Sequence, residues 1–402
     1  MRLDARRAWR PRAWYAVAVT VVALAGCGVG EIGLPGPPPP PEQVIQVAPV
    51  HGSKDVRSSA PVVVSVADGR LERVRVVRAG DVRRRPLSGR MSEDGLRWSP
   101  ADDAVLEVAS KYRVDAVAVD RHGRRIARHT SFTTVVPEHR FIGFFRPEHG
   151  AVVGAGMIVS FDFDRPIADR AAVERAIRVT SHPPVKVVGH WFGDRRVDFR
   201  PQTYWKPGSE VLVRIRLRGV KAAPGAYGIQ HRTARFTVAR RQVSIVDAAR
   251  YTMTVYRNHR VLATLPVTAG APHTPTYNGK MVVMARHEVT RMDGSTVGFG
   301  GEYDIPDVPH ALRLTTSGTF LHGNYWAPRA TFGSVNTSHG CIGLHDVQGG
   351  GAPSPARWFF DNSLVGDVVQ VVNSADRTVD PHNGLGGWNL TWAQWRAGSA
   401  LR

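Results

Sequence analysis

The pattern that most constrains the fold is a set of short, alternating apolar runs that occurs twice along the chain. The run LRWSP at residues 96–100, followed by 112–114 and 132–133, recurs as VDFRP at 197–201, followed by 211–213 and 236–237. Alternation with a period of two is typical of half-buried β-strands, and turn residues such as Asp68-Gly69 separate the runs. The repeat of about a hundred residues has the length of one immunoglobulin-like sandwich. The sequence therefore predicts a mainly β chain that contains two such sandwiches in tandem.

The N-terminus carries an export signal. An Arg-rich start precedes the apolar run AWYAVAVTVVALAG, which ends at Cys27. This run is shorter than the about 20 residues that a membrane span needs. Residues 24–27 (LAGC) resemble a bacterial lipobox, in which the cysteine becomes the lipidated N-terminus. An ordinary signal peptide that happens to contain cysteine is the alternative. Lipidation predicts a protein anchored through Cys27 on the outer face of the cell membrane, facing the cell wall and the periplasmic space.

Changes in composition predict six segments. They are a signal peptide (1–27), a Pro/Gly-rich tether (28–43), two immunoglobulin-like domains (44–138 and 139–240), a third β-rich domain (241–373) and a C-terminal tail (374–402). The proline run in the second segment predicts a stiff, extended spacer. Residues 355–363 (PARWFFDNS) are the one stretch of the third domain with a helical pattern. The tail contains Trp388, Trp392 and Trp395, and we expect it to pack back on the third domain because exposed indole rings are costly.

The chain is strongly basic, with a formal net charge of +19 and only six lysines among its 53 basic residues. Such a charge suggests contact with a polyanion or an anionic surface. The arginines are scattered through strand-like segments, and neither zinc-finger spacing nor a helix-turn-helix pattern accompanies them. A solvated basic face is the commoner meaning of such runs. We therefore expect no nucleic-acid partner.

Residues 320–348 bring two histidines and the second of only two cysteines into one segment. A thiol becomes a nucleophile only as a thiolate, so it needs a proton acceptor, and His322 and His339 are the available ones. Glycines in the segment allow close backbone approach, so that amides near Cys341 can donate to a developing oxyanion. If Cys27 carries lipid, Cys341 has no partner for an internal disulfide. A buried, inert cysteine is the alternative.

These residues resemble the signature of the L,D-transpeptidases with a YkuD-type catalytic domain, enzymes of bacterial peptidoglycan. The chain has the motif SHGC at residues 338–341, and His322 lies nineteen residues before Cys341. The two sandwiches, the lipobox and the tail GLGGWNLTWAQWRAG are similar to those of actinobacterial members of the family. The resemblance therefore covers nearly the whole chain.

The resemblance implies a reaction in two steps. Cys341 attacks the carbonyl of the diamino acid at the third position of a tetrapeptide stem, and terminal D-alanine leaves from a thioester acyl-enzyme. His322 acts as the general base, oriented by the backbone carbonyl of Gly323, and His339 supports it. The backbone amides of Gly340 and Cys341, together with Tyr303 of the flap, hold the oxyanion. The amine of a diamino acid from a neighbouring stem then resolves the thioester into a 3→3 cross-link. No cofactor and no metal are implied.

The resemblance also implies substrate-binding residues and inhibitors. The residues expected to line the cleft are Tyr303 from a flap, Met292, Trp326, Ser338 and Gly343. Gly343 stands where the family usually has Asn or Arg, and we expect this departure to change a substrate contact rather than the chemistry. Core packing is the alternative for Met292, Trp326 and His339. Carbapenem β-lactams are expected to acylate Cys341.

Other functions remain open at this point. His322, His339, Cys341 and His345 form a nominal zinc ligand set, although their spacing matches no common zinc motif. The protein is alternatively a non-catalytic wall-binding lipoprotein, in which the sandwiches do the binding. Within the enzyme class, water as the acceptor would make the protein an L,D-carboxypeptidase.

Overall fold

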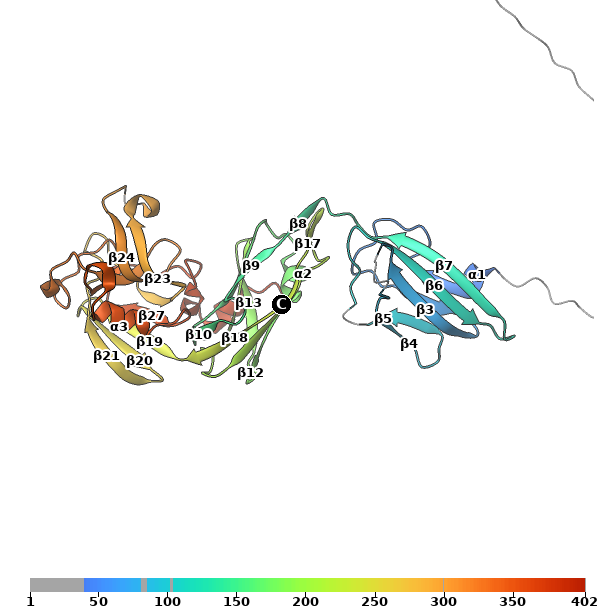
Figure 1. The fold of residues 1–402 in the computed structure, drawn as a ribbon, viewed down its shortest axis with the longest axis horizontal. Coiled ribbons are helices and arrows are strands. Elements are labelled where there is room, and N and C mark those ends of the chain that lie inside the picture. The colour runs from blue at the N-terminus through green and yellow to red at the C-terminus, as the bar shows by residue number, and fades with distance from the viewer. Residues whose placement is uncertain (1–39, 81–84, 102–103, 299, 402) are drawn as a thin grey trace, which may run out of the picture.

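The structure, a computed structural model, describes residues 40–80, 85–101, 104–298 and 300–401. The predicted signal peptide, Cys27 and most of the predicted tether lie outside these residues. Within the described ranges, no helix is both long enough and apolar enough to cross a membrane. The described chain forms three β-rich bodies that follow one another along a line (Figure 1). The predicted fold class, with two immunoglobulin-like sandwiches before a β-rich catalytic domain, is confirmed.

The first body packs two sheets face to face around Trp98 and Phe132. One sheet has the order β1-β2-β5-β4, formed by Ile45–Ala48, Val63–Val66, Arg97–Pro100 and Gly89–Met91. The other has the order β3-β6-β7, formed by Arg70–Arg78, Lys111–Val119 and Arg125–Thr133. A short helix, α1 (Pro41–Val44), precedes β1. In β6 every second side chain is buried, as the alternating sequence predicts.

The second body is a larger sandwich. Its sheets have the orders β13-β14-β11-β9 (Val187–Phe192, Arg196–Pro201, Val159–Phe163, Gly143–Arg146) and β10-β18-β15-β12 (Val152–Gly154, His231–Arg240, Glu210–Arg216, Ile177–His182). A small sheet, β16-β17-β8 (Lys221–Ala223, Ala226–Gly228, His139–Phe141), and helix α2 (Arg170–Arg175) complete it. Phe161 and Trp205 are fully buried in its core.

The third body has two sheets, and the predicted reactive segment (320–348) supplies two strands of the second, β25 and β26. The sheets have the orders β21-β20-β19-β27-β22 (Arg260–Pro266, Thr252–Arg257, Gln242–Asp247, Val368–Val372, Gly279–Val282) and β23-β24-β25-β26 (Ala285–Asp293, Asp304–Arg313, Phe320–Asn324, Ile342–His345). Helix α3 (Pro355–Asp361) buries Phe359 in their shared core. Three 3₁₀ turns lie in its loops: η1 (Gly294–Val297), η2 (Arg329–Thr331) and η3 (Gln348–Gly350).

The second and third bodies are closely joined. The amides of Gly154 and Gly156 donate to the carbonyls of Val365 and Gly366, at 2.8 and 2.9 Å. A Cβ atom at Gly154 would come within 2.2 Å of a carboxylate oxygen of Asp367, so only glycine fits this junction. The junction therefore holds the third body against the second sandwich by direct backbone contact.

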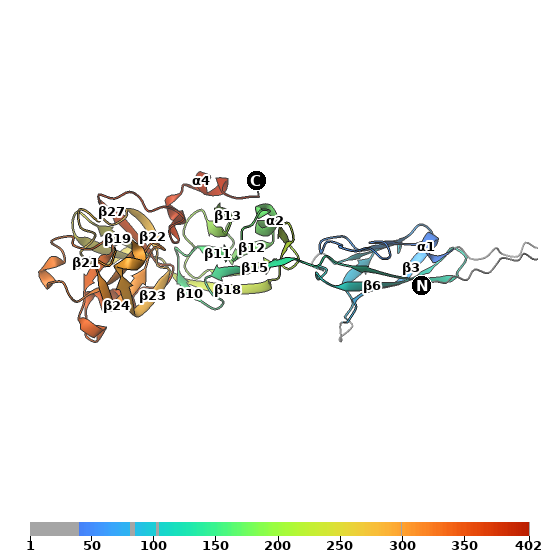
Figure 2. The same ribbon diagram turned by 90° about the horizontal axis from the view of Figure 1, so that it is seen from above.

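The first part of the C-terminal tail packs on the third domain, as expected: Thr378 bridges to Asn278, and Val379 joins the core of the third body. The later part of the tail departs from the expectation, because it packs mainly on the second body. It contains η4 (Gly386–Asn389) and α4 (Trp392–Ala397), and it runs back along the second body (Figure 2). Asn389 does bond to Lys280 of the third body, but Trp388 joins the core of the second. The indole N–H of Trp395 donates to the carbonyl of Val188 at 2.9 Å. Trp388 and Trp395 pack on the second sandwich because it provides both apolar surface and carbonyl acceptors for their indole N–H groups.

Candidate active site

Two parallel strands bring the predicted nucleophile and base together. The register of β25 with β26 sets Leu321 beside Ile342 and His322 beside Gly343. Cys341, which directly precedes β26, therefore lies at the start of β25, and the amide of Phe320 donates to its sulfur at 3.4 Å. β25 lies inside its sheet and β26 at the edge, and both strands are held by core packing through Leu321 and Ile342.

His322 is held in one tautomer. Its Nδ1 atom lies 2.8 Å from the carbonyl oxygen of Gly323, and since a carbonyl only accepts, Nδ1 carries the hydrogen. Nε2 is then the atom that can take a proton. Burial lowers the pKa of His322, while the Gly323 hydrogen bond and the nearby charge of Asp346 act in the opposite direction. The ring of Trp326 stacks on the imidazole at 5.6 Å between centroids.

The thiol of Cys341 is neutral at rest. Burial raises the pKa of Cys341 to about 11, although the Phe320 amide favours the thiolate. At neutral pH the site therefore holds a thiol beside an uncharged imidazole. Such a pair reacts when the base removes the proton during attack, rather than from a preformed ion pair.

The SHGC motif forms a tight turn ahead of β26. The hydroxyl of Ser338 donates to the carbonyl of Cys341 at 2.6 Å, and the amide of Gly340 donates to that hydroxyl at 3.1 Å. Gly340 has φ +108°, which a side chain would strain. The Gly340 amide, one of the two expected oxyanion donors, is thus engaged inside the turn. The amide of Cys341, the other expected oxyanion donor, donates to no group in the described part of the chain and is therefore the one of the two that is available to an oxyanion.

His339 lines the same cavity as Cys341 and contacts the flap. Its Nε2 atom lies 2.9 Å from a carboxylate oxygen of Glu302, and its ring lies 5.0 Å from that of Tyr303. Burial raises the pKa of Tyr303 to about 12, with added contributions from Cys341, Asp293 and Glu302. Tyr303 therefore remains a neutral phenol. His339 supports the site by contacting the flap that carries Tyr303.

Two cavities meet at Cys341. One, of about 270 Å³, contains all five residues predicted to bind substrate: Met292, Tyr303, Trp326, Ser338 and Gly343. The other, of about 230 Å³, is lined by charged residues that include His287, Arg291, Asp293 and Arg313. Cys341, Met292 and Tyr303 line both. The thiol is therefore accessible from two sides of the flap tyrosine.

The first cavity also contains residues that the sequence analysis missed. Asn324, Ile305 and Thr337 line it. Asn324 lies two residues after His322 on β25, and the strand period of two would have placed both side chains on one face. At Gly343 a Cβ atom would lie 2.9 Å from the methyl group of Thr268, so a larger side chain here needs that residue to move.

The zinc alternative has no ligand set in this fold. Among the described residues, no group of three or more His, Cys, Asp or Glu side chains is placed to hold a metal ion. His345 packs edge-on against Phe332 at 5.6 Å. The four nominal ligands therefore do not converge on a point.

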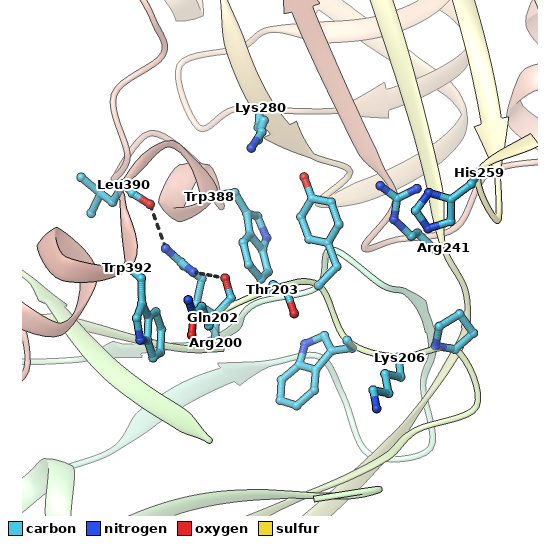
Figure 3. A pocket seen from close by; sticks show the side chains of 13 residues that line it. Arg200, Gln202, Thr203, Lys206, Arg241, His259, Lys280, Trp388, Leu390 and Trp392 are labelled. Atoms are coloured by element: carbon cyan, nitrogen blue, oxygen red, sulfur yellow. Dashed lines mark hydrogen bonds between the residues drawn. The ribbon is translucent and has the colours of Figure 1, made fainter. Parts of the chain in front are cut away.

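A larger cavity, of about 570 Å³, lies where the second body, the third body and the tail meet (Figure 3). Its walls are basic and aromatic, with Arg200, Lys206, Arg241, Trp388 and Trp392 among them. The Arg200 guanidinium donates to the carbonyl of Leu390 at 3.0 Å. None of the residues predicted for the reaction lies here, so the cavity at Cys341 is the candidate active site.

Comparisons with known proteins identify the family of this chain. The L,D-transpeptidase catalytic domain (YkuD) matches residues 241–371, and a bacterial Ig domain matches residues 53–221. L,D-transpeptidase 2 of Mycobacterium tuberculosis (strain CDC 1551 / Oshkosh) is 37% identical over 354 residues, which cover 87% of this chain and 83% of that protein. L,D-transpeptidase 5 of M. tuberculosis (strain ATCC 25618 / H37Rv) is 30% identical over 361 residues, with 88% and 76% covered.

Solved structures include an L,D-transpeptidase in complex with imipenem. It is 31% identical, with a TM-score of 0.48, and the match covers 59% of this chain and 100% of that one. The relatives in sequence match along most of their length, including the region of the sandwiches. The chain belongs to the L,D-transpeptidase family.

Proposed function

We propose that this protein is a peptidoglycan L,D-transpeptidase that forms 3→3 cross-links through a thioester at Cys341. The observation that carries the proposal is the position of a single thiol, beside a base held in one tautomer, at the junction of two cavities. A transpeptidase must hold a donor stem and admit an acceptor stem at the same sulfur. Two approaches to Cys341 supply that geometry.

The first half-reaction forms the thioester. His322 Nε2 takes the thiol proton as the sulfur attacks the carbonyl carbon of the third residue of a tetrapeptide stem. The oxyanion of the tetrahedral intermediate accepts from the amide of Cys341. When the intermediate collapses, the C–N bond breaks and the departing amine of D-alanine takes the proton from His322.

The second half-reaction consumes the thioester. The side-chain amine of a second stem attacks the same carbonyl carbon, and His322 removes a proton from that amine. The C–S bond then breaks, and the sulfur recovers its proton from the imidazolium. His322 thus acts as base and then acid in each half, which requires a pKa close enough to neutrality to do both.

We extend the proposal to inhibition and placement. A carbapenem presents a strained carbonyl to the same thiol, so Cys341 is its acylation site. Lipidation of Cys27 would anchor the chain at the outer face of the membrane. The linear order of the three bodies suits the two sandwiches to act as a spacer, with their arginines in weak contact with anionic wall polymers (Figure 1).

Mass spectrometry of purified disaccharide-tetrapeptide, incubated with the full-length protein or with Cys341→Ala, tests the proposal. A 3→3 dimer made only by the unmutated protein supports it. Tripeptide without dimer would make the protein an L,D-carboxypeptidase. No turnover by folded protein would favour the non-catalytic wall-binding alternative.

A further inference from the structure

A buried polar chain that the proposed mechanism does not use lies behind the catalytic histidine. Asp346 is 2% exposed, and one of its carboxylate oxygens lies 2.7 Å from Nδ1 of His310. Its other oxygen accepts from the hydroxyl of Ser354 at 2.7 Å and from the amide of Val347 at 2.9 Å. Burying a carboxylate costs desolvation free energy even when all its hydrogen bonds are made, so we looked for a role for Asp346 in its contacts.

The position of Asp346 relates it directly to His322. A Cβ atom at Gly323 would come within 2.1 Å of the Asp346 oxygen that faces His310. The carboxylate therefore lies against the backbone of the residue whose carbonyl accepts from His322. One peptide unit separates the negative charge from the imidazole, and both groups are desolvated, so their attraction is little screened by water.

The backbone is arranged to hold this charge in place. Asp346 directly follows β26, and its amide donates to the carbonyl of Asn324 on β25 at 3.2 Å. His310 on β24 has φ +51°, a conformation that costs free energy for a residue with a side chain. Ser354 is the N-cap of α3, so the same hydroxyl that bonds Asp346 also accepts from the amide of Arg357. Three elements thus converge on one carboxylate.

The other ionisable groups of the neighbouring elements are directed elsewhere. Arg357 on α3 donates to the carbonyls of Gly350 and Gly351, and Arg286 on β23 covers the ring of Phe360. His345 on β26 packs against Phe332. Within the described chain, the side chains bonded to Asp346 are His310 and Ser354, so no arginine or lysine neutralises it.

We propose that Asp346, held by His310 and Ser354, is a positioning residue that stabilises the protonated form of His322 across the Gly323 peptide unit. His322 becomes an imidazolium in each half-reaction, and a nearby negative charge lowers the free energy of that state. The inference rests on the proposed role of His322 as the base. It concerns the histidine itself, however, and does not depend on which acceptor resolves the thioester.

The test compares full-length wild-type protein with Asp346→Asn, which removes the charge at nearly constant volume. Asp198→Asn is the matched control, because Asp198 is also fully buried and paired, with Arg196, but lies in the second sandwich. The titration of His322, followed by NMR of ¹³C-labelled histidine and assigned with His322→Gln, should move to lower pH by about half a unit or more in Asp346→Asn. The control should leave it in place.

A kinetic measurement complements the titration. The rate at which imipenem acylates Cys341, followed by intact mass, should fall about tenfold in Asp346→Asn, and its acid limb should move to lower pH. A structural role would lower the rate without moving the limb. If Asp346→Asn does not fold, Asp346→Ser removes the same charge with a smaller side chain, and the same shift is expected.

An unchanged His322 titration in a folded, uncharged variant overturns the inference. The outcomes for the two proposals are separable. If the wild type forms no 3→3 dimer, transpeptidation fails while the titration of His322 still decides the role of Asp346. If dimers form and the titration does not move, only the role of Asp346 fails.

Discussion

The carbonyl oxygen of Gly323 lies 2.8 Å from Nδ1 of His322, so the residue after the base fixes the tautomer of the base itself. Both atoms belong to β25, and the hydrogen bond therefore forms with the strand and needs no loop to close. The orienting group is a backbone carbonyl rather than the carboxylate of a triad. The proton-accepting Nε2 atom is thus available before any substrate binds.

Replacing the base should abolish most of the activity without unfolding the protein. His322→Gln keeps a side chain of similar volume but has no group that can both take and return a proton. We expect cross-linking to fall by about 10²–10⁴-fold, the usual contribution of general acid–base catalysis. The dimer yield from disaccharide-tetrapeptide measures it. His129→Gln, on the exposed face of the first sandwich, is the control and should keep full activity.

The high pKa of the thiol predicts slow alkylation at neutral pH. Because burial raises the pKa of Cys341 to about 11, little thiolate exists at pH 7. The rate of iodoacetamide alkylation, followed on the Cys341 peptide by mass spectrometry, should rise about tenfold per pH unit between pH 8 and pH 10. A rate that levels off below pH 8 would instead mean a thiolate–imidazolium pair at rest.

Much of this architecture could be predicted from local patterns. The strand alternation predicted the sandwiches, and the pattern at 355–363 predicted the helix found at Pro355–Asp361. The spacing of His322 and Cys341 predicted a shared site, and the two residues meet because His322 lies in β25 and Cys341 directly precedes the neighbouring β26. All five predicted substrate-binding residues line one cavity. These features depend on residues that are close in sequence or on a motif with a fixed geometry.

The remaining features depend on contacts between distant segments. His310 and Asp346 are 36 residues apart and meet only after β24, β25 and β26 have paired. The use of the Gly340 amide within the turn depends on the rotamer of Ser338, which no sequence pattern specifies. The later part of the tail lies on the second sandwich because Val188 presents a carbonyl to Trp395, a relationship across 207 positions.

Removing the flap tyrosine should change how the thioester is resolved. Tyr303 lines both cavities at Cys341, so Tyr303→Ala would join them and admit water to the acyl-enzyme. We expect the ratio of tripeptide to 3→3 dimer to rise severalfold. Mass spectrometry of the products measures the ratio. Tyr303→Phe, which keeps the ring, is the control, and an equal effect of both substitutions would contradict the explanation.

Asp367 should make the junction between the second and third bodies sensitive to pH. Burial raises the pKa of Asp367 from 3.8 to about 7, despite the ion pair with Arg240. Between these values the folded state holds a proton that the unfolded state releases. The contribution of Asp367 to stability is therefore complete below pH 3.8 and is lost as the pH rises through about 7.

An uncharged replacement tests this sign. The wild type should lose stability between pH 5 and pH 8 as Asp367 ionises, whereas asparagine cannot ionise. The melting temperature of Asp367→Asn should therefore rise relative to that of the wild type over this range. Asp198→Asn is again the matched control: it breaks a buried ion pair with Arg196 and should lower the melting temperature at both pH values. If the melting temperature of Asp367→Asn instead falls further below that of the wild type as the pH rises, the carboxylate is ionised in the folded state.

The tail should contribute to stability through Trp395 more than through its neighbour. Trp395 is fully buried, its ring stacks on His190 at 4.8 Å, and the guanidinium of Arg200 lies 4.4 Å from its centroid. Trp395→Ala would leave a cavity and an unpaired carbonyl at Val188, a cost of about 3–5 kcal/mol in the free energy of unfolding. Trp392 lies one turn earlier and is partly exposed, so Trp392→Ala should lower the free energy of unfolding by only about 1–2 kcal/mol. Urea denaturation followed by circular dichroism measures both, and equal losses would mean that the tail is held by its backbone contacts instead.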